Sequence, residues 1–293
     1  MDANLIVAQL FSGLTSAMTL FLVASGLSLI FGVVNVFNFA HGSFYLLGAY
    51  FAYQMVSVTG IPFWPGVLLA TAGAGAAGAV MEYVFLRRIY GRGGEAGFQI
   101  LLTYSFILIL DDVVKMIWGT DYKSIERPES LSASFTLGEI SVPRYDLVVI
   151  LVGVLVAAGM WWVIRKTRFG RNLRAISANR EMASCLGVNV PLTLSLVFGL
   201  ATALGGLSGA LSAPTRTVTP GAGIEVIIGS LIVVVIGGLG NFWGAFVGAL
   251  IIGEVTAFGI LFLPQWALLF SYAVMALVLV FRPEGLLARK GSA

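Results

Sequence analysis

The chain has 293 residues, of which 58% are hydrophobic and only 11% are charged, and its formal net charge is +3. A soluble domain carries about 25% charged residues, so this composition excludes a water-soluble globule. One cysteine and one histidine exclude an intrachain disulfide and a multi-cysteine or multi-histidine metal site, and we expect this chain itself to bind no metal or cofactor. Long apolar segments favour helices over a barrel. The composition predicts an all-α integral membrane protein, a polytopic helical bundle that forms one transmembrane domain over residues 1–293.

Nine apolar runs follow one another along the chain. A hydrocarbon core about 30 Å thick needs about 20 helical residues, and most of the runs approach or exceed that length. The runs are Leu5–Val34, residues 44–58, Gly66–Leu86, Gly97–Trp118, Tyr145–Ile164, Leu192–Ala213, Ile224–Ile236, Phe242–Leu263 and Trp266–Phe281. We expect about nine spans, with a range of eight to ten, because either of two glycine-containing breaks could be a re-entrant feature instead of a turn.

Basic residues gather in three loops that this count places on one side of the membrane. The three are Arg87–Arg92, residues 165–191 and the tail after Phe281. Short loops rich in Lys and Arg stay in the cytoplasm, whereas loop 119–144, with three basic and four acidic residues, fits the outside. The N-terminus lacks the positive region of a signal peptide, so we expect the first run to be retained. The predicted orientation has the N-terminus outside and the C-terminus in the cytoplasm.

The longest polar interruption in the second half is loop 165–191, which carries six basic residues against one acid. Asn179 can cap a short helix, Glu181 lies in its first turn, where the helix dipole favours an acid, and Gly187 can end it in the left-handed conformation. This helix would offer Met182, Cys185 and Leu186 to a soluble partner. The alternative interpretation is an ordinary positive-inside loop with a surface helix.

The two glycine-containing breaks resemble each other in sequence. Asn38–Phe44 (NFAHGSF) and Asn241–Phe246 (NFWGAF) align with one gap, and the predicted topology places both on the same face. Interrupted helices at matching places in two halves indicate a transport pathway, although a chance match of short glycine-rich stretches remains the competing explanation. Glu254 is a further candidate, because an acid in mid-span without a charged neighbour should face the bundle interior or a water-filled path. The candidate pathway residues are Asn35, Asn38, His41, Ser43, Asn241 and Glu254.

Motifs for catalysis are missing from the sequence. It contains no G-x-x-x-x-G-K-[ST] phosphate loop, no H-E-x-x-H and no G-x-S-x-G, so no catalytic residues or metal ligands are assigned and the chain should not hydrolyse ATP itself. Asp111 and Lys115 are four residues apart, in the favoured acid-first order for a helical ion pair, and we interpret them as a structural pair.

Four stretches together resemble the membrane permease subunit of branched-chain amino-acid ABC importers of the leucine/isoleucine/valine type. They are Gly32–Tyr50, Arg168–Asn189, Val235–Gly253 and Phe281–Gly285. The resemblance runs essentially from end to end, and its most specific parts are the N-F-A-H-G run and the M-A-S-x-L-G-x-N run. It implies a type II-like importer permease in the bacterial inner membrane, which moves branched-chain or other hydrophobic amino acids.

The resemblance also implies partners: a second, paralogous permease, two ATPase subunits that bind ATP and Mg²⁺, and a periplasmic substrate-binding protein. No nucleic acid is expected. Carried over to this sequence, the helix that couples the permease to the ATPases comprises Arg174, Asn179, Arg180, Glu181, Met182, Ala183, Ser184, Cys185, Leu186 and Gly187. Relatives that move urea, short amides or small organic acids remain an alternative within the family. A stand-alone secondary transporter or channel is the alternative from another class.

Overall fold

Two long helices, α1 (Ala3–Val34) and α8 (Val190–Ser212), lie at the centre of the fold. The structure is a computed structural model that describes residues 3–35, 38–88, 96–137 and 140–287. α1 packs against α5, α8, α9 and α10, and α8 also packs against α2 and α3. Within the most apolar window of α1, 78% of the residues are buried inside the protein, so this helix is surrounded by protein on most sides.

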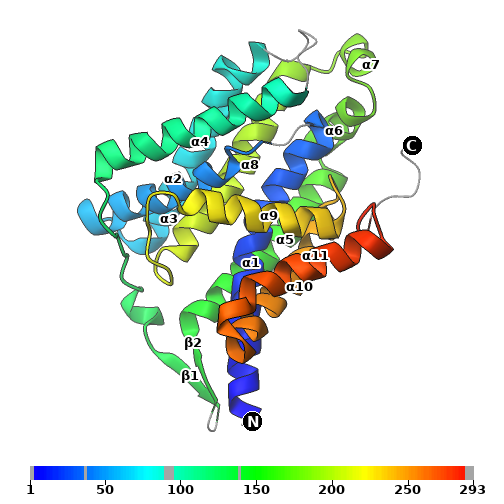
Figure 1. The fold of residues 1–293 in the computed structure, drawn as a ribbon. Helices are drawn as coiled ribbons and strands as arrows, with labels where there is room; N and C mark the ends of the chain where they lie inside the picture. The colour runs from blue at the N-terminus through cyan, green and yellow to red at the C-terminus, as the bar shows by residue number, and fades with distance from the viewer. Residues whose placement is uncertain (1–2, 36–37, 89–95, 138–139, 288–293) are drawn as a thin grey trace.

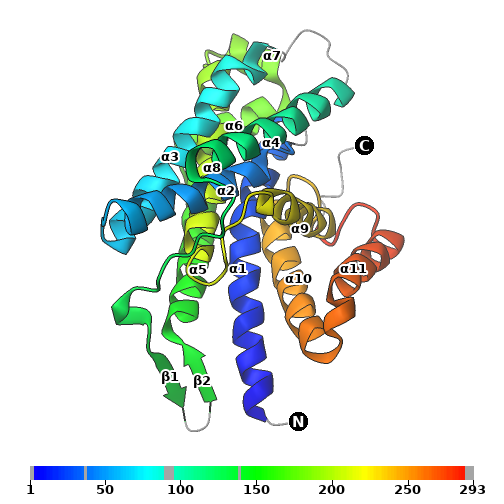
Figure 2. The same cartoon turned by 60° about the vertical axis from the view of Figure 1, so that its left-hand side comes forward.

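The other elements surround this pair (Figures 1 and 2). The longer helices are α3 (Phe63–Val84), α4 (Ala96–Trp118), α5 (Arg144–Lys166), α10 (Phe242–Phe262) and α11 (Ala267–Phe281), and the shorter ones are α2 (His41–Tyr53), α6 (Arg168–Ala178), α7 (Arg180–Cys185) and α9 (Ala222–Gly237). Four short elements complete the helical structure: the π-helix η1 (Gln54–Val58) and the 3-10 helices η2 (Leu86–Arg88), η3 (Glu129–Leu131) and η4 (Pro264–Trp266).

Each of the nine predicted apolar runs forms a helix, which confirms the predicted all-α class. Among the described residues, six helices or helix pairs are long and apolar enough to cross a membrane: those that begin at Asn4, Phe63, Arg144, Val190, Phe242 and Pro264. α9 has 16 residues and α2 has 13, too few to cross alone at 1.5 Å per residue. In Figure 1, α9 runs across the long axis of α1 instead of beside it.

Small residues allow the central helices to approach closely. A Cβ atom on Gly209 of α8 would overlap the carbonyl oxygen of Tyr45 on α2, and one on Gly78 of α3 would overlap the Thr202 side chain of α8. Both contacts are between helices far apart in sequence. The glycines therefore set the distances from α8 to α2 and from α8 to α3.

The predicted outer loop 119–144 contains a feature that the sequence analysis did not anticipate. Strands β1 (Ser134–Leu137) and β2 (Ile140–Pro143) pair in antiparallel register, with Phe135 opposite Val142. The hairpin lies at the end of the molecule where the N-terminus lies, and α6 and α7 lie at the opposite end (Figure 2). Each strand has four residues, the shortest alternation from which a strand is recognised in a sequence.

The predicted structural pair in α4 is confirmed and has a second role. Lys115 Nζ lies 2.6 Å from Asp111 Oδ2. The other oxygen of Asp111 accepts a hydrogen bond of 2.6 Å from the backbone N–H of Gly221, immediately before α9. Asp111 therefore ties α4 to the start of the crosswise helix.

Candidate functional site

The short helix predicted between Asn179 and Gly187 is present as α7, and its caps are those that the sequence indicates. Asn179 Oδ1 accepts a 2.9 Å hydrogen bond from the N–H of Met182. Gly187 has a φ of 82°, and its N–H donates to the carbonyl of Ser184 while the N–H of Val188 donates to that of Ala183. This pair of bonds is the Schellman arrangement, which closes a helix with a left-handed glycine. A six-residue helix is thus defined at both ends by its own sequence.

The outer face of α7 is apolar and exposed. Met182 is 60% exposed and Leu186 is 76% exposed, whereas Ala183 faces inward at 2%. Cys185 and Glu181 are exposed beside them, as is Ser184. Exposed apolar side chains on a capped helix at one end of the molecule form a small surface suited to a protein partner.

The helix α6, which precedes α7, was not predicted. Its N-cap is Thr167, whose Oγ1 accepts a 3.2 Å hydrogen bond from the N–H of Gly170. Leu173 and Ile176 point inward and are buried, while Arg168 and Arg171 are exposed. Apolar residues at Phe169, Leu173 and Ile176 have helical spacing, and this signal could have revealed the helix despite the basic composition of the segment.

Three polar side chains of the segment 165–191 bond to the carbonyl ends of neighbouring helices. Arg174 donates to the carbonyl of Ile164 near the end of α5. Ser177 Oγ donates to the carbonyl of Gly32 at 2.5 Å, and Arg180 Nη2 donates to that of Val33 at 3.2 Å. Part of this cluster of positive charge therefore completes the ends of α1 and α5 within the chain itself.

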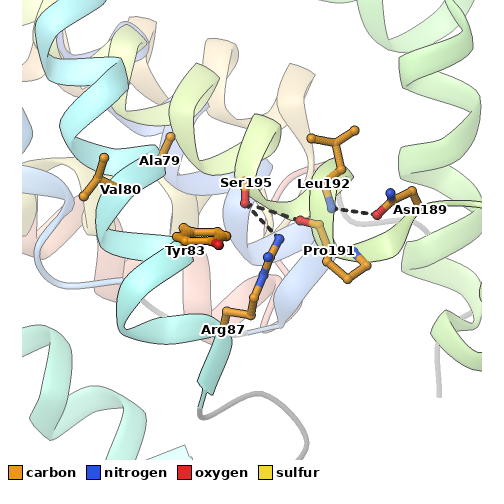
Figure 3. Close-up of a pocket in the computed structure, with 8 residues that line it drawn as sticks. All are labelled: Ala79, Val80, Tyr83, Arg87, Asn189, Pro191, Leu192 and Ser195. Atoms are coloured by element: carbon orange, nitrogen blue, oxygen red, sulfur yellow. Dashed lines mark hydrogen bonds between the residues drawn. The ribbon is translucent and has the colours of Figure 1, made fainter.

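A buried acid of α3 is bonded to the first part of α8, which follows this segment in the chain. Glu82 is fully buried and accepts a hydrogen bond from Ser195 Oγ on α8. Arg87 Nε lies 4.0 Å from Glu82 Oε1, and Arg87 Nη2 donates to Ser195 Oγ at 3.3 Å. In Figure 3 the guanidinium group of Arg87 points from η2 toward Ser195, beside Tyr83 of α3, whose ring centroid is 4.9 Å from the guanidinium carbon. Arg87, Tyr83 and Ser195, with Asn189 and Leu192, line a pocket of about 450 Å³.

The first break returns the chain from the end of α1 toward its middle. Asn35 has a φ of 59°, the only positive value among described residues other than glycine. His41 then begins α2 fully buried, with its Nε2 3.1 Å from the carbonyl oxygen of Val23. Val23 lies three turns before the end of α1, so α2 starts inside the bundle. This placement is the re-entrant option that the sequence left open.

Polar atoms at the first break are buried with few partners. Asn38 is 2% exposed, His41 0% and Ser43 3%. Within the described part of the chain, three of their side-chain atoms have no hydrogen-bond partner: Oδ1 and Nδ2 of Asn38, and Nδ1 of His41. Buried polar groups are usually satisfied, so these side chains are candidates for a functional role.

The second break is a tight glycine turn whose polar groups are satisfied. Gly238 and Gly240 have φ values of 103° and 73°. Asn241 Oδ1 accepts from the N–H groups of Trp243 and Gly244 at 3.0 and 3.1 Å, which caps α10, and its Nδ2 donates to the carbonyl of Leu287. The C-terminal segment therefore packs against the turn and supplies a hydrogen-bond acceptor to it.

One open cavity lies between the two breaks. Its volume is about 1440 Å³, and Asn35 and Asn241 both line it. Arg165, Arg174 and Ser177 form its wall toward α6, and Glu284 belongs to its rim. The structure therefore brings together one pathway candidate from each break with the loop that was predicted to contact a partner.

Glu254 lies elsewhere, at the contact of α10 with α1. Its carboxylate lies directly over Gly13, where a Cβ atom would overlap it. Gln9, one turn earlier on α1, donates to the carbonyl of Ala257. Oε2 of Glu254 is buried without a hydrogen-bond partner in the described part of the chain. Glycine at position 13 thus makes room for an acid inside the bundle.

Three residues of the predicted basic loops lie outside the described residues: Arg92, Arg289 and Lys290. The described part of the chain also contains no group of three or more His, Cys, Asp or Glu side chains that could hold a metal ion.

Comparisons with known proteins show the family to which this chain belongs. The family described as "Branched-chain amino acid transport system / permease component" matches residues 9–279. The high-affinity branched-chain amino acid transport system permease protein BraD of Pseudomonas aeruginosa is 30% identical over 296 residues, 96% of this chain and 95% of BraD. The corresponding permease protein LivH of Escherichia coli is 27% identical, with the same coverage.

A solved structure supports the fold. PsaBC from Streptococcus pneumoniae, determined in complex with a Fab, has a TM-score of 0.53 and covers 99% of this chain and 97% of its own. At 14% identity the likeness concerns the fold alone. The chain is thus a multi-pass membrane permease, and it belongs to the family of branched-chain amino acid transport system permease components that its four sequence motifs predicted.

Proposed function

We propose that this chain is one permease subunit of an ATP-driven importer that moves branched-chain or other hydrophobic amino acids across the bacterial inner membrane. The observation that carries the proposal is the family match over residues 9–279, with relatives named as branched-chain amino acid permeases over nearly their whole length. The complete importer would contain a second permease, two ATPases that hold ATP and Mg²⁺, and a periplasmic binding protein.

In this proposal α7 contacts the ATPases. Its exposed Met182 and Leu186 would enter an apolar groove on the partner, and basic side chains of α6 would meet acidic groups around it. Closure of the ATPases on ATP would push α7 and rock the bundle between outward-facing and inward-facing states. The N-terminus and the β1–β2 hairpin would then face the periplasm, because they lie at the opposite end from α7.

The proposed pathway uses the polar side chains of the two breaks and Glu254. Asn35 and Asn241 line the open cavity, which would be the cytoplasmic mouth of the path. Asn38, His41 and Ser43 are packed between helices in this conformation, so they would become accessible only when α2 and α9 move. The polar atoms of Asn38 and His41 that lack partners would bond to water or substrate at that point.

Purification of the tagged chain from native membranes in mild detergent tests the assembly. Mass spectrometry should recover two ATPases and a second permease, and proteoliposomes that contain the complex and the binding protein should take up leucine only with ATP inside. Uptake of leucine without ATP by the chain alone would instead establish a secondary transporter or channel. Urea and short amides, offered to the same vesicles, test the substrate class.

A substitution on α7 tests the coupling assignment. Met182→Asp places a charge in the proposed apolar contact and should abolish uptake and recovery of the ATPases, while membrane insertion stays intact. Met182→Leu is the matched control, because it keeps an apolar side chain at the same exposed position and should transport normally. Normal uptake by Met182→Asp would exclude α7 as the ATPase contact.

A further inference from the structure

The C-terminal end of α1 is completed by side chains of the segment that contains α7. The last four carbonyls of a helix lack partners within the helix. In α1 the carbonyl of Phe31 accepts from the N–H of Asn35 at 2.8 Å. The next two, Gly32 and Val33, accept from Ser177 Oγ at 2.5 Å and Arg180 Nη2 at 3.2 Å. These bonds bridge more than 140 residues of sequence.

The same end of α1 touches both breaks. It leads directly into the first break through Asn35, whose φ is 59°. At the second break, a Cβ atom on Gly32 would lie only 3.3 Å from the carbonyl oxygen of Gly240, and one on Gly240 only 3.1 Å from the Cα of Gly32. Two glycines thus place the backbone of α1 against the backbone of the second break, without side chains between them.

We propose that Ser177 and Arg180, together the carbonyl latch, are positioning residues that carry the movement of α7 to the end of α1 and from there to both breaks. The inference rests on the proposed function, because α7 moves only if the ATPases move it. Ser177 lies in the last turn of α6 and Arg180 in the first turn of α7. The latch therefore holds α1 at the joint between the two short helices.

The geometry explains why side-chain bonds suit this task. Leu173 and Ile176 already bury the inner face of α6, so the latch is not needed to keep α6 on the bundle. Hydrogen bonds are directional, and a charged donor strengthens them. The bonds from Ser177 and Arg180 to adjacent carbonyls fix the direction of α1 relative to α7. Apolar packing alone would allow the two helices to slide past each other.

The ratio of transport to ATP hydrolysis tests the latch. The assembled importer, reconstituted with its binding protein in liposomes, is compared as wild type and as the double variant Ser177→Ala/Arg180→Gln, with leucine uptake and ATP hydrolysis measured in the same vesicles. We expect at least a tenfold loss of leucine moved per ATP hydrolysed, whatever the change in the hydrolysis rate itself. Two single variants at Ser177 are compared as well. Ser177→Ala should lower the amount of leucine moved per ATP, and Ser177→Thr, which keeps the hydroxyl, should retain most of it.

Ser105→Ala is the matched control, because it also removes a serine hydroxyl that donates to a backbone carbonyl, but within α4 alone, and it should leave the ratio unchanged. An unchanged ratio in the double variant would overturn the latch. A parallel loss of uptake and hydrolysis in a fully assembled complex would also overturn it, since that result assigns the residues to ATPase contact. Failure of the proposed function differs from both: wild-type uptake would not depend on ATP.

A distance measurement tests the latch without transport. Cys185 on α7 is the chain's one cysteine and is exposed, so it takes a spin label directly, and Leu10→Cys on the exposed outer part of α1 takes the second. The distance distribution between the labels should be narrow in the otherwise unchanged protein and clearly broader in the Ser177→Ala/Arg180→Gln background. Equal widths in the two backgrounds would overturn the inference whatever the transport result.

Discussion

At the second break Asn241 caps α10 with its side-chain oxygen, whereas at the first break Asn38 caps nothing: the N-cap position of α2 is Ala40, without a side-chain bond. Asn38 lies buried, with neither amide atom bonded in the described part of the chain. The first break enters the bundle at the level of Val23, and the second turns at its edge beside the cavity.

The comparison shows that two similar sequence motifs have different structural roles. The second break is satisfied by its own caps and by the C-terminal segment, as expected of a structural turn. The first break leaves polar atoms without partners in a tightly packed site, as expected where a protein trades stability for function. The following changes break or sharpen this contrast, in order of decreasing effect.

Gly237→Ala should destroy the second break and with it the fold. A Cβ atom there would overlap the carbonyl carbon and oxygen of Gly244, so α9 and α10 must separate, at a cost of about 3 kcal/mol or more. Gly229→Ala on the same helix is the control, because its Cβ meets only the Leu20 side chain at 3.3 Å. Size-exclusion chromatography in detergent should lose the monodisperse peak for the first variant only.

His41→Ala should destabilise the first break substantially. It removes the contact with the carbonyl of Val23 and leaves a cavity beside Gly26, which packs on the imidazole. We expect a loss of about 2 kcal/mol, read as a lower thermal midpoint in detergent, and slower uptake. His41→Gln, which can still donate to Val23, should recover part of the stability, and equal midpoints for the two variants would contradict the assigned bond.

Asn241→Ala and Asn38→Ala should differ although both remove an amide. Loss of the Asn241 cap should cost about 1 kcal/mol, and Asn241→Ser, which keeps a capping oxygen, should recover most of it. Removal of an unsatisfied amide at Asn38 should leave stability nearly unchanged while it reduces uptake. Equal thermal midpoints for the two alanine variants would remove the distinction between the breaks.

Asn35→Gly should give the smallest effect and the opposite sign. Glycine adopts a φ of 59° without steric cost, so we expect a gain of about 0.5 kcal/mol. At the second break Gly240→Asn, with a φ of 73° and Gly32 close by, should lose stability. Paired thermal melts decide the matter, and a loss in both variants would mean that the Asn35 side chain supports the first break.

Local signals made much of this structure predictable. The nine apolar runs marked the helices, and Asn179 and Gly187 marked both ends of α7, because capping depends on residues within one turn. The ion pair of Asp111 and Lys115 followed from helical spacing alone. These features need no knowledge of the tertiary fold.

The remaining features depend on contacts between distant parts of the chain. The depth at which His41 starts α2 is set by Val23 and Gly26 on α1, and the bonds of Ser177 and Arg180 depend on where α1 ends. The difference between Asn38 and Asn241 is likewise tertiary, because their local sequences are alike. The two roles of similar motifs therefore became visible only in the folded chain.

The C-terminal segment has a consequence for biosynthesis. The N–H groups of Leu286 and Leu287 donate to the carbonyls of Ile236 and Gly237, and Asn241 donates to Leu287. The turn between α9 and α10 therefore receives its last hydrogen bonds from residues that leave the ribosome some fifty positions later. We expect this turn to mature only after translation of the chain is nearly complete, so that nascent chains stalled before Leu286 would insert into the membrane with an open second break.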